Sequence, residues 1–251
     1  MLALIRSELV KARSTRATAW TLPLTIVLTG GLGALLGAAW RNSDLVKDDT
    51  AMRFAAFYPL TLSQMCLVVF AVLLVGNEFS TGTIRTSLIA VPGRVRFLTA
   101  KFIAGGLILT GVAVLAVAVS QVMTRLTLGD YAPPLDDKTL WLAILGACLY
   151  LPMIGLFAMG LTATLRSSIG ALGILMPLLF LNSQGFGNIP KVKELAQYLP
   201  DQVGQSLMRM FPDNDPIFSV DYNVTGAAFI LLAWVATALL GGYLVTRRRE
   251  A

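Results

Sequence analysis

The sequence predicts an all-α polytopic membrane protein with six transmembrane helices. Of its 251 residues, 56% are hydrophobic and only 14% are charged, whereas about 25% of the residues in a soluble domain are charged. Six long segments contain no Asp, Glu, Lys or Arg. Each is longer than the roughly 20 apolar residues that cross a bilayer as a helix. Together they leave room only for connecting loops, so we expect one transmembrane domain over residues 1–251.

We expect a helix before the first span. Leu2, Ile5, Leu9 and Ala12 recur at helical spacing, with basic residues off that stripe. This pattern predicts an amphipathic N-terminal helix in the headgroup region of the bilayer, rather than a frayed basic tail.

The predicted spans are residues 17–40, 54–76, 102–124, 139–165, 167–190 and 222–246. The first is too long for the core of a cleaved signal peptide, about 7–15 residues, although Gly37, Ala38 and Ala39 resemble a cleavage site. Only Arg166 separates the fourth span from the fifth, which predicts a tight hairpin there.

The orientation follows from the loops. With the N-terminus inside, the inside segments hold twelve of the 20 Lys and Arg residues and three of the 14 acids. This matches the excess of positive charge that cytoplasmic loops carry. We therefore expect a multi-pass protein of the plasma membrane with both termini cytoplasmic. The basic residues flank the spans, so they indicate contact with membrane lipid rather than with nucleic acid.

Two short helices are expected in the outside loop between the fifth and sixth spans, over residues 191–199 and 201–211, with Pro200 breaking them and Asp201 available as an N-cap. The apolar members of this loop are expected to fold back against the membrane surface, and they are Leu195, Leu199, Val203, Leu207 and Met210.

Metal and disulfide chemistry are not expected. The chain has no histidine, which excludes a Cys/His zinc site. Cys66 and Cys148 both fall inside predicted spans, where small buried hydrophobic side chains are expected rather than a disulfide.

Polar residues inside the spans are few and neutral. They are either hydrogen-bonding groups between helices or the lining of a substrate path, and the candidate path residues are Ser63, Gln64, Gln121, Asn182 and Gln184. The absence of an ionisable residue from the spans argues against transport driven by an ion gradient. In the first span, Gly33 and Gly37 have the spacing that lets two helices approach closely, and we expect them to offer a packing face for a second chain.

The segment expected in the cytoplasm between the second and third spans, residues 77–100, is polar, and its apolar residues recur at helical spacing. Ile84, Leu88 and Val91 form an apolar stripe on one short helix, which Ser80 and Thr81 can cap and which Pro92 ends. Because a helix of about two turns is marginal alone, we expect it to dock on a partner at the cytoplasmic face.

The same segment carries a resemblance to a known family. Glu78-Phe-Ser-Thr-Gly82-Thr83-Ile84-Arg85, followed by Leu88, Pro92, Arg94 and Lys101, is similar to the signature after the second span of ATP-binding-cassette type-2 (ABC-2) permeases. The likeness extends over nearly the full chain, with a basic interfacial helix, six spans and two short helices between spans five and six.

The resemblance implies a permease subunit of an ATP-driven exporter. Segment 77–100 would then contain the coupling helix that docks in the ATPase, and its contact residues would be Glu78, Phe79, Gly82, Thr83, Ile84, Arg85, Leu88, Pro92 and Arg94. The implied partners are soluble ATPase subunits and a second permease chain, identical or paralogous. The chain has no G-x-x-x-x-G-K-[ST] phosphate loop, so we expect no enzyme activity and no cofactor in it, with ATP and Mg²⁺ bound by the partner.

Two other classes stay open. One is a non-transporting scaffold or sensor subunit that uses the same ATPase. The other is a membrane-embedded enzyme, which would need a cluster of acids, histidines or a nucleophile at the membrane face. The expected substrate of a transporter with this neutral polar path is amphipathic, such as a drug, a peptide or a lipid.

Overall fold

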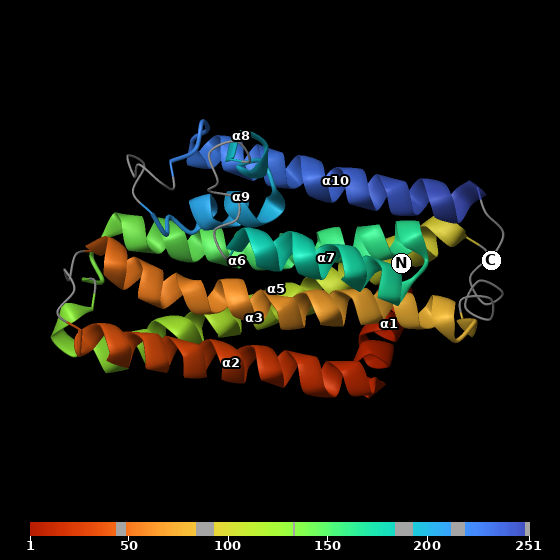
Figure 1. Ribbon diagram of the computed structural model, residues 1–251. Helices are drawn as coiled ribbons and strands as arrows, with labels where there is room; N and C mark the ends of the chain where they lie inside the picture. Colours follow the sequence, from red (N-terminus) through yellow and green to blue (C-terminus); the bar gives the residue numbers. More distant parts are fainter. Residues whose placement is uncertain (44–48, 84–92, 133, 184–192, 212–218, 249–251) are drawn as a thin grey trace.

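The computed structural model describes residues 1–43, 49–83, 93–132, 134–183, 193–211 and 219–248. Within these ranges the regular elements are all helices, as the all-α prediction requires (Figure 1). They are α1 (Leu2–Ser14), α2 (Arg16–Arg41), α3 (Asp49–Ser80), α5 (Arg94–Leu128), the 3₁₀ turn η1 (Gly129–Tyr131), α6 (Lys138–Leu165), α7 (Ser168–Ser183), α8 (Lys193–Ala196), α9 (Pro200–Leu207) and α10 (Val224–Arg248).

Five of the described helices are long and apolar enough to cross a membrane, namely α2, α3, α5, α6 and α10. The sixth expected span corresponds to α7, which has 16 residues in the described part of the chain. At 1.5 Å per residue it extends about 24 Å, less than the roughly 30 Å of a bilayer core. The expected end of this span, residues 184–190, lies outside the described residues. The hairpin between α6 and α7 is confirmed, because Arg166 adopts a left-handed conformation with φ of 55°.

The helices form one bundle with two different ends (Figure 1). α2 packs along α3 and α5, and α10 packs along α6. The short helix α1 lies across the end of the bundle where α3 finishes, and the last turn of α10 reaches the same end. We call this the α1 end. α9 packs on α6, α7 and α10 nearer the opposite end.

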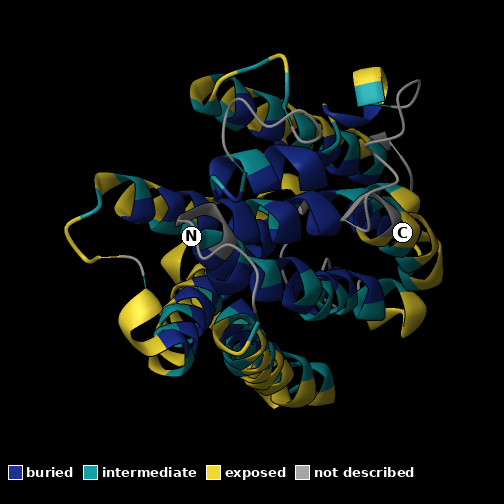
Figure 2. Ribbon diagram, turned by 60° about the vertical axis from the view of Figure 1, so that its left-hand side comes forward, coloured by how far each residue is buried: buried dark blue, intermediate teal, exposed yellow. Residues whose placement is uncertain are grey.

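Burial separates central from peripheral helices (Figure 2). α3 and α6 are mostly buried inside the bundle, whereas only 22% of the apolar window is buried in α2 and in α10. The exposed side chains include Trp20, Val27 and Leu35 on α2 and Phe229 and Leu240 on α10. Large apolar surfaces on several sides of one chain are typical of helices that face hydrocarbon rather than water.

The two glycines expected to face a second chain are used inside this one. Gly33 and Gly37 are buried, and a Cβ at either position would meet Thr124 or Thr127 of α5. Thr124 also donates a hydrogen bond to the Gly33 carbonyl at 3.5 Å. The inference of close packing is correct, but its partner is α5 of the same chain, so these glycines offer no packing face for a second chain.

The helix ends around the polar segment also differ from the prediction. α3 continues to Ser80 and α5 begins at Arg94, so the charged residues Glu78 and Lys101 lie within helices rather than in a loop. Hydropathy marks only the apolar stretch of a helix, and it does not detect the polar turns that extend beyond the hydrocarbon.

The two expected helices between α7 and α10 are present but shorter. Pro200 begins α9 rather than separating two helices, because a proline at the first helical position leaves no amide unpaired. Leu199 is the N-cap, so the expected capping role of Asp201 is wrong. Val203, Leu207 and Met210 were expected to fold back against the membrane surface, and they are instead buried in the core of the bundle, whereas Leu195 is exposed.

Two glycines bring α9 and α6 into close contact. A Cβ at Gly146 of α6 would overlap the backbone carbonyl of Leu207, and a Cβ at Gly204 of α9 would overlap the ring of Tyr150. The backbone of α9 therefore lies directly on α6.

Replacing Gly146 with alanine is expected to destabilise the protein by about 1–3 kcal/mol, because the methyl group meets backbone that cannot rotate away. The measurement is the thermal unfolding of the purified chain in detergent. Gly111→Ala is the matched control, since a Cβ there meets nothing within 4 Å. The control is expected to be neutral or to stabilise by up to about 1 kcal/mol through helix propensity. Equal stability of the two variants would contradict the close approach.

Candidate functional site

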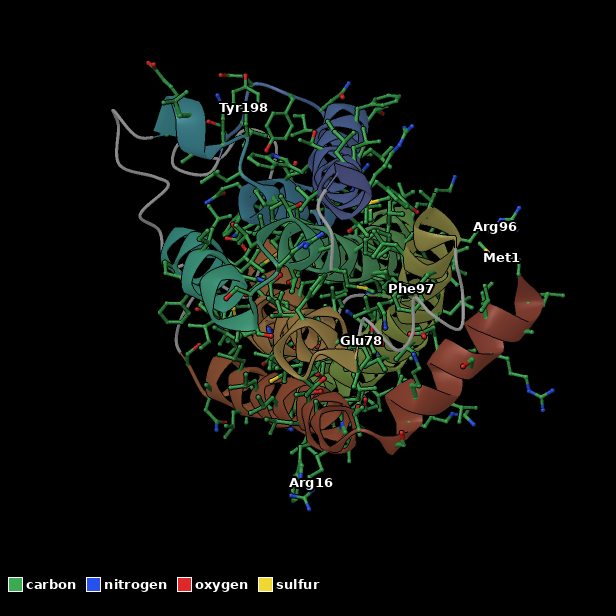
Figure 3. All side chains as sticks on the ribbon, turned by 90° about the vertical axis from the view of Figure 1, so that its right-hand side faces the viewer. Met1, Arg16, Glu78, Arg96, Phe97 and Tyr198 are labelled. Carbon is green, nitrogen blue, oxygen red and sulfur yellow. The ribbon has the colours of Figure 1, made fainter. Side chains whose placement is uncertain are left out.

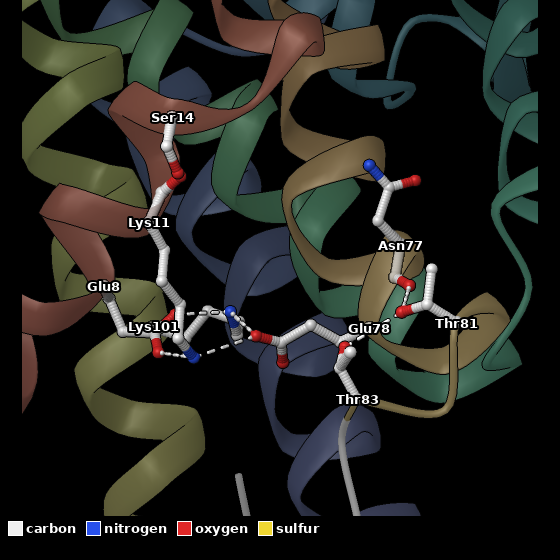
Figure 4. Close-up of polar contacts among 8 residues, drawn as sticks. All are labelled: Glu8, Lys11, Ser14, Asn77, Glu78, Thr81, Thr83 and Lys101. Atoms are coloured by element: carbon white, nitrogen blue, oxygen red, sulfur yellow. Dashed lines mark hydrogen bonds and ion pairs between the residues drawn. The ribbon is translucent and has the colours of Figure 1, made fainter. Parts of the chain in front are cut away.

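Four charged side chains meet at the α1 end, and we call them the charge cluster: Glu8 and Lys11 of α1, Glu78 of α3 and Lys101 of α5 (Figure 4). Lys101 Nζ lies 2.5 Å from Glu8 Oε2 and 2.9 Å from Glu78 Oε1. Lys11 Nζ completes the cluster at 2.7 Å from Glu8 Oε1 and 3.3 Å from Glu78 Oε1. Each acid therefore contacts both lysines.

The charge cluster is largely removed from solvent. The side chain of Lys101 is 3% exposed, that of Glu8 6% and that of Glu78 13%, whereas Lys11 is 45% exposed. Buried charges are tolerated only when they are paired and hydrogen-bonded, and here two acids balance two lysines. The ring of Phe97 lies 5.4 Å from Lys101 Nζ and 5.5 Å from Lys11 Nζ, within the range of a cation–π contact.

The pKa values of the α1 residues reflect this pairing. Burial raises the pKa of Glu8, but Lys101 and Lys11 outweigh it and leave the pKa below its ordinary value of 4.5. Burial lowers the pKa of Lys11, but Glu8 and Glu78 outweigh it and leave the pKa above its ordinary value. A lowered acid pKa stabilises the fold above pH 4.5, and this contribution is lost as the pH falls through the folded pKa. The ion pair between Glu8 and Lys11 is therefore intact at neutral pH.

Figure 3 views the molecule from the α1 end, with Glu78 and Phe97 toward the middle and Arg16 and Arg96 at the periphery. Sequence reasoning included Glu78 as a contact for a partner and missed that it shares Lys11 and Lys101 with Glu8. One signal was present: Glu8 is three residues after Ile5 and four before Ala12, on the apolar stripe of the helix. An acid that stays ionised on a buried stripe requires a cation within the protein.

The residues after Glu78 close the end of α3. Thr81 donates through its amide and its hydroxyl to the Asn77 carbonyl, at 3.0 and 2.7 Å, and Ser80 donates to the same oxygen at 3.1 Å. Gly82 follows with a φ of +70°, which glycine adopts without strain. Ser80 and Thr81 were expected to cap the start of the next helix, and they instead donate hydrogen bonds to a carbonyl in the last turn of α3. Thr83 contacts the Thr81 hydroxyl at 2.9 Å.

The remaining expected coupling residues fall in two groups. Phe79 packs against the core, with the Arg166 guanidinium 5.8 Å above its ring, and Arg94 begins α5. The others lie outside the described residues, and they are Ile84, Arg85, Leu88 and Pro92. A pocket of about 710 Å³ opens beside the charge cluster, between α1 and the end of α3, with Ser14 and Asn77 in its lining.

Two of the expected path residues, Ser63 and Gln64, form hydrogen bonds between helices. Thr29 of α2 donates to Ser63 of α3 at 2.7 Å. Gln64 contacts both Tyr150 of α6 and Asp201 of α9. The amide nitrogen of Gln121 is buried, and among the described residues it has no hydrogen-bond partner. The side chain of Asn182 and all of Gln184 lie outside the described part of the chain.

The two cysteines are free, and both are partly rather than fully buried. Among the described residues, no group of three or more Cys, Asp or Glu side chains is placed to hold a metal ion. No protein-family model and no curated protein sequence matches this chain. Within its described residues, the chain is a helical protein with five candidate membrane-spanning helices.

Proposed function

We propose that the chain is the membrane-spanning permease subunit of an ATP-driven exporter of the ABC-2 class, with six spans and both termini in the cytoplasm of the cell. α7 would be the fifth span, and the α1 end would face the cytoplasm. The energy would come from a separate ATPase subunit, because the sequence holds no phosphate loop.

The observation that carries this proposal is the charge cluster. Glu78 and Lys101 lie at the two ends of the polar segment, and their ion pair of 2.9 Å joins the base of that segment. Glu8 ties α1 to the same point. A force applied to the segment would then act on α1, α3 and α5 together rather than on one flexible loop.

This connection suits a coupling device. Such a device biases a bundle between two discrete arrangements, and it needs a rigid link between the docked helix and the spans. The long helices α3 and α5 continue from the charge cluster into the middle of the bundle, where α3 carries Ser63 and Gln64. We propose that the substrate is amphipathic and passes near these neutral polar groups.

The proposal is tested by isolating the affinity-tagged chain from its native membrane in mild detergent. The proteins that remain bound are identified by mass spectrometry. We expect an ATPase that contains a phosphate loop, at one copy per permease chain, in a complex with two permease chains. Isolation of the chain without any ATP-binding protein, before and after chemical cross-linking, would reject the proposal.

A further inference from the structure

Asp201 is an ionisable residue buried inside the bundle, although it belongs to a loop in the sequence. It occupies the first turn of α9, and only 1% of it is exposed. Its Oδ1 accepts a hydrogen bond from Nε2 of Gln64 at 3.2 Å. Its Oδ2 is buried and has no hydrogen-bond partner among the described residues. Gln64 lies near the middle of α3, so the carboxyl group lies well inside the bundle.

Gln64, which donates the hydrogen bond to Asp201, is held in one orientation. The Tyr150 hydroxyl donates to Oε1 of Gln64 at 2.5 Å, which leaves the amide nitrogen of Gln64 to face the carboxyl group. The ring of Tyr150 also packs on Gly204, one turn after Asp201. Gln64, Tyr150 and Asp201 thus form a buried trio that joins α3, α6 and α9.

Among the described residues, no cation balances the carboxyl group, because Asp201 takes part in none of the salt bridges formed by Lys11 and Lys101. Among the elements packed around it, α7 has no ionisable residue and α6 presents Tyr150. The other ionisable residues of α3, α6 and α10 are Asp49, Arg53, Tyr58, Cys66, Glu78, Lys138, Cys148, Tyr243, Arg247 and Arg248.

A buried carboxylate with one neutral donor is costly, whereas the neutral acid costs far less. Burial raises the pKa of Asp201 to about 7, and this value already includes the lowering effect of the Gln64 hydrogen bond. The carboxyl group is too enclosed for a hydrated cation, and a proton needs no additional space.

We propose that Asp201 is a proton-binding site whose occupancy determines how firmly α9 is seated against α3 and α6. When the carboxyl group is neutral, α9 stays packed on α6 at Gly146. Ionisation of the carboxyl group loosens this packing. The direction follows from the raised pKa: the stabilisation is fully present below the ordinary pKa of 3.8 and is lost as the pH rises through about 7. The site rests on its geometry and does not depend on an ATPase partner.

The first measurement is infrared difference spectroscopy of the purified full chain between about pH 5 and about pH 9. We expect the carbonyl band of a buried carboxylic acid to disappear with a midpoint near neutrality, and to be absent at every pH from Asp201→Asn. Gln64→Leu removes the hydrogen bond that lowers the pKa, so it is expected to shift the midpoint to higher pH. A band that does not titrate in this range, or a midpoint unmoved in Gln64→Leu, would overturn the proposal.

The second measurement reports on α9 itself. Ser206→Cys is introduced in a chain with Cys66 and Cys148 replaced by serine, and is labelled with a membrane-impermeant maleimide. Because thiol reactivity itself changes with pH, each rate is divided by that of the same chain carrying Asp201→Asn. We expect this ratio to rise several-fold as the pH passes through neutrality. A ratio that is constant with pH would show that Asp201 does not control the seating of α9.

Discussion

Replacing Lys101 with methionine is expected to destabilise the protein by roughly 3–5 kcal/mol, the usual cost of removing one partner from a buried ion pair. The substitution retains much of the side-chain volume and removes the charge. Glu8 and Glu78 are then left buried with Lys11, which is half exposed. The measurement is the unfolding free energy of the purified chain in detergent micelles, obtained from a denaturant titration.

Arg96→Met is the matched control, since Arg96 lies on the same helix but is exposed. Its expected effect is within about 0.5 kcal/mol, as is usual for a surface substitution. A second variant separates charge from shape: adding Glu8→Gln and Glu78→Gln to Lys101→Met removes the unpaired acids, and we expect it to recover most of the lost stability. If Lys101→Met proves as stable as Arg96→Met, the lysine does not neutralise the two acids.

Replacing Ile84 and Leu88 with aspartate is expected to release the proposed ATPase from the chain. Both residues belong to the apolar stripe of segment 77–100, and burying such a side chain at an interface is worth about 2–5 kcal/mol. The loss of even one corresponds to a dissociation constant weaker by about 25-fold or more. Membrane insertion should be unaffected, because both positions lie between the end of α3 and the start of α5.

The control places the same charges, at the same spacing, off that stripe. Thr86→Asp with Ala90→Asp has the four-residue interval of the first pair, on the opposite side of the expected helix. We expect this control to retain the ATPase in an affinity isolation and the first pair to lose it. If both double variants behave alike, the apolar stripe does not form the docking surface.

The parts of the fold that the sequence predicts depend on local pattern. The long apolar stretches, the helix before them and the hairpin at Arg166 each follow from a continuous segment. Among the described residues the structure contains that helix, the hairpin and five helices long enough to cross a membrane. The neutral polar residues of the spans were predicted either to hydrogen-bond between helices or to line a substrate path. Ser63 and Gln64 form hydrogen bonds between helices.

The parts that the sequence does not predict depend on pairing between distant residues. The charge cluster joins positions 8, 78 and 101, and the spacing of these residues does not indicate which charges meet. Gly33 and Gly37 predict a close helix neighbour without specifying that it is α5. Asp201 follows a proline in a polar segment, a pattern typical of a cap at the surface, and only tertiary packing places it against Gln64.

We propose that a separate ATPase drives this chain through segment 77–100. This is tested by the ATP hydrolysis rate of three purified samples: the chain alone, its complex with the co-isolated ATPase, and the same ATPase mixed with the Ile84→Asp, Leu88→Asp chain. We predict no hydrolysis by the chain alone, and hydrolysis by the complex that differs from that of the free ATPase. The variant should leave the ATPase at its free rate. Hydrolysis by the chain alone, or an ATPase rate that is the same with and without the parental chain, would contradict the claim.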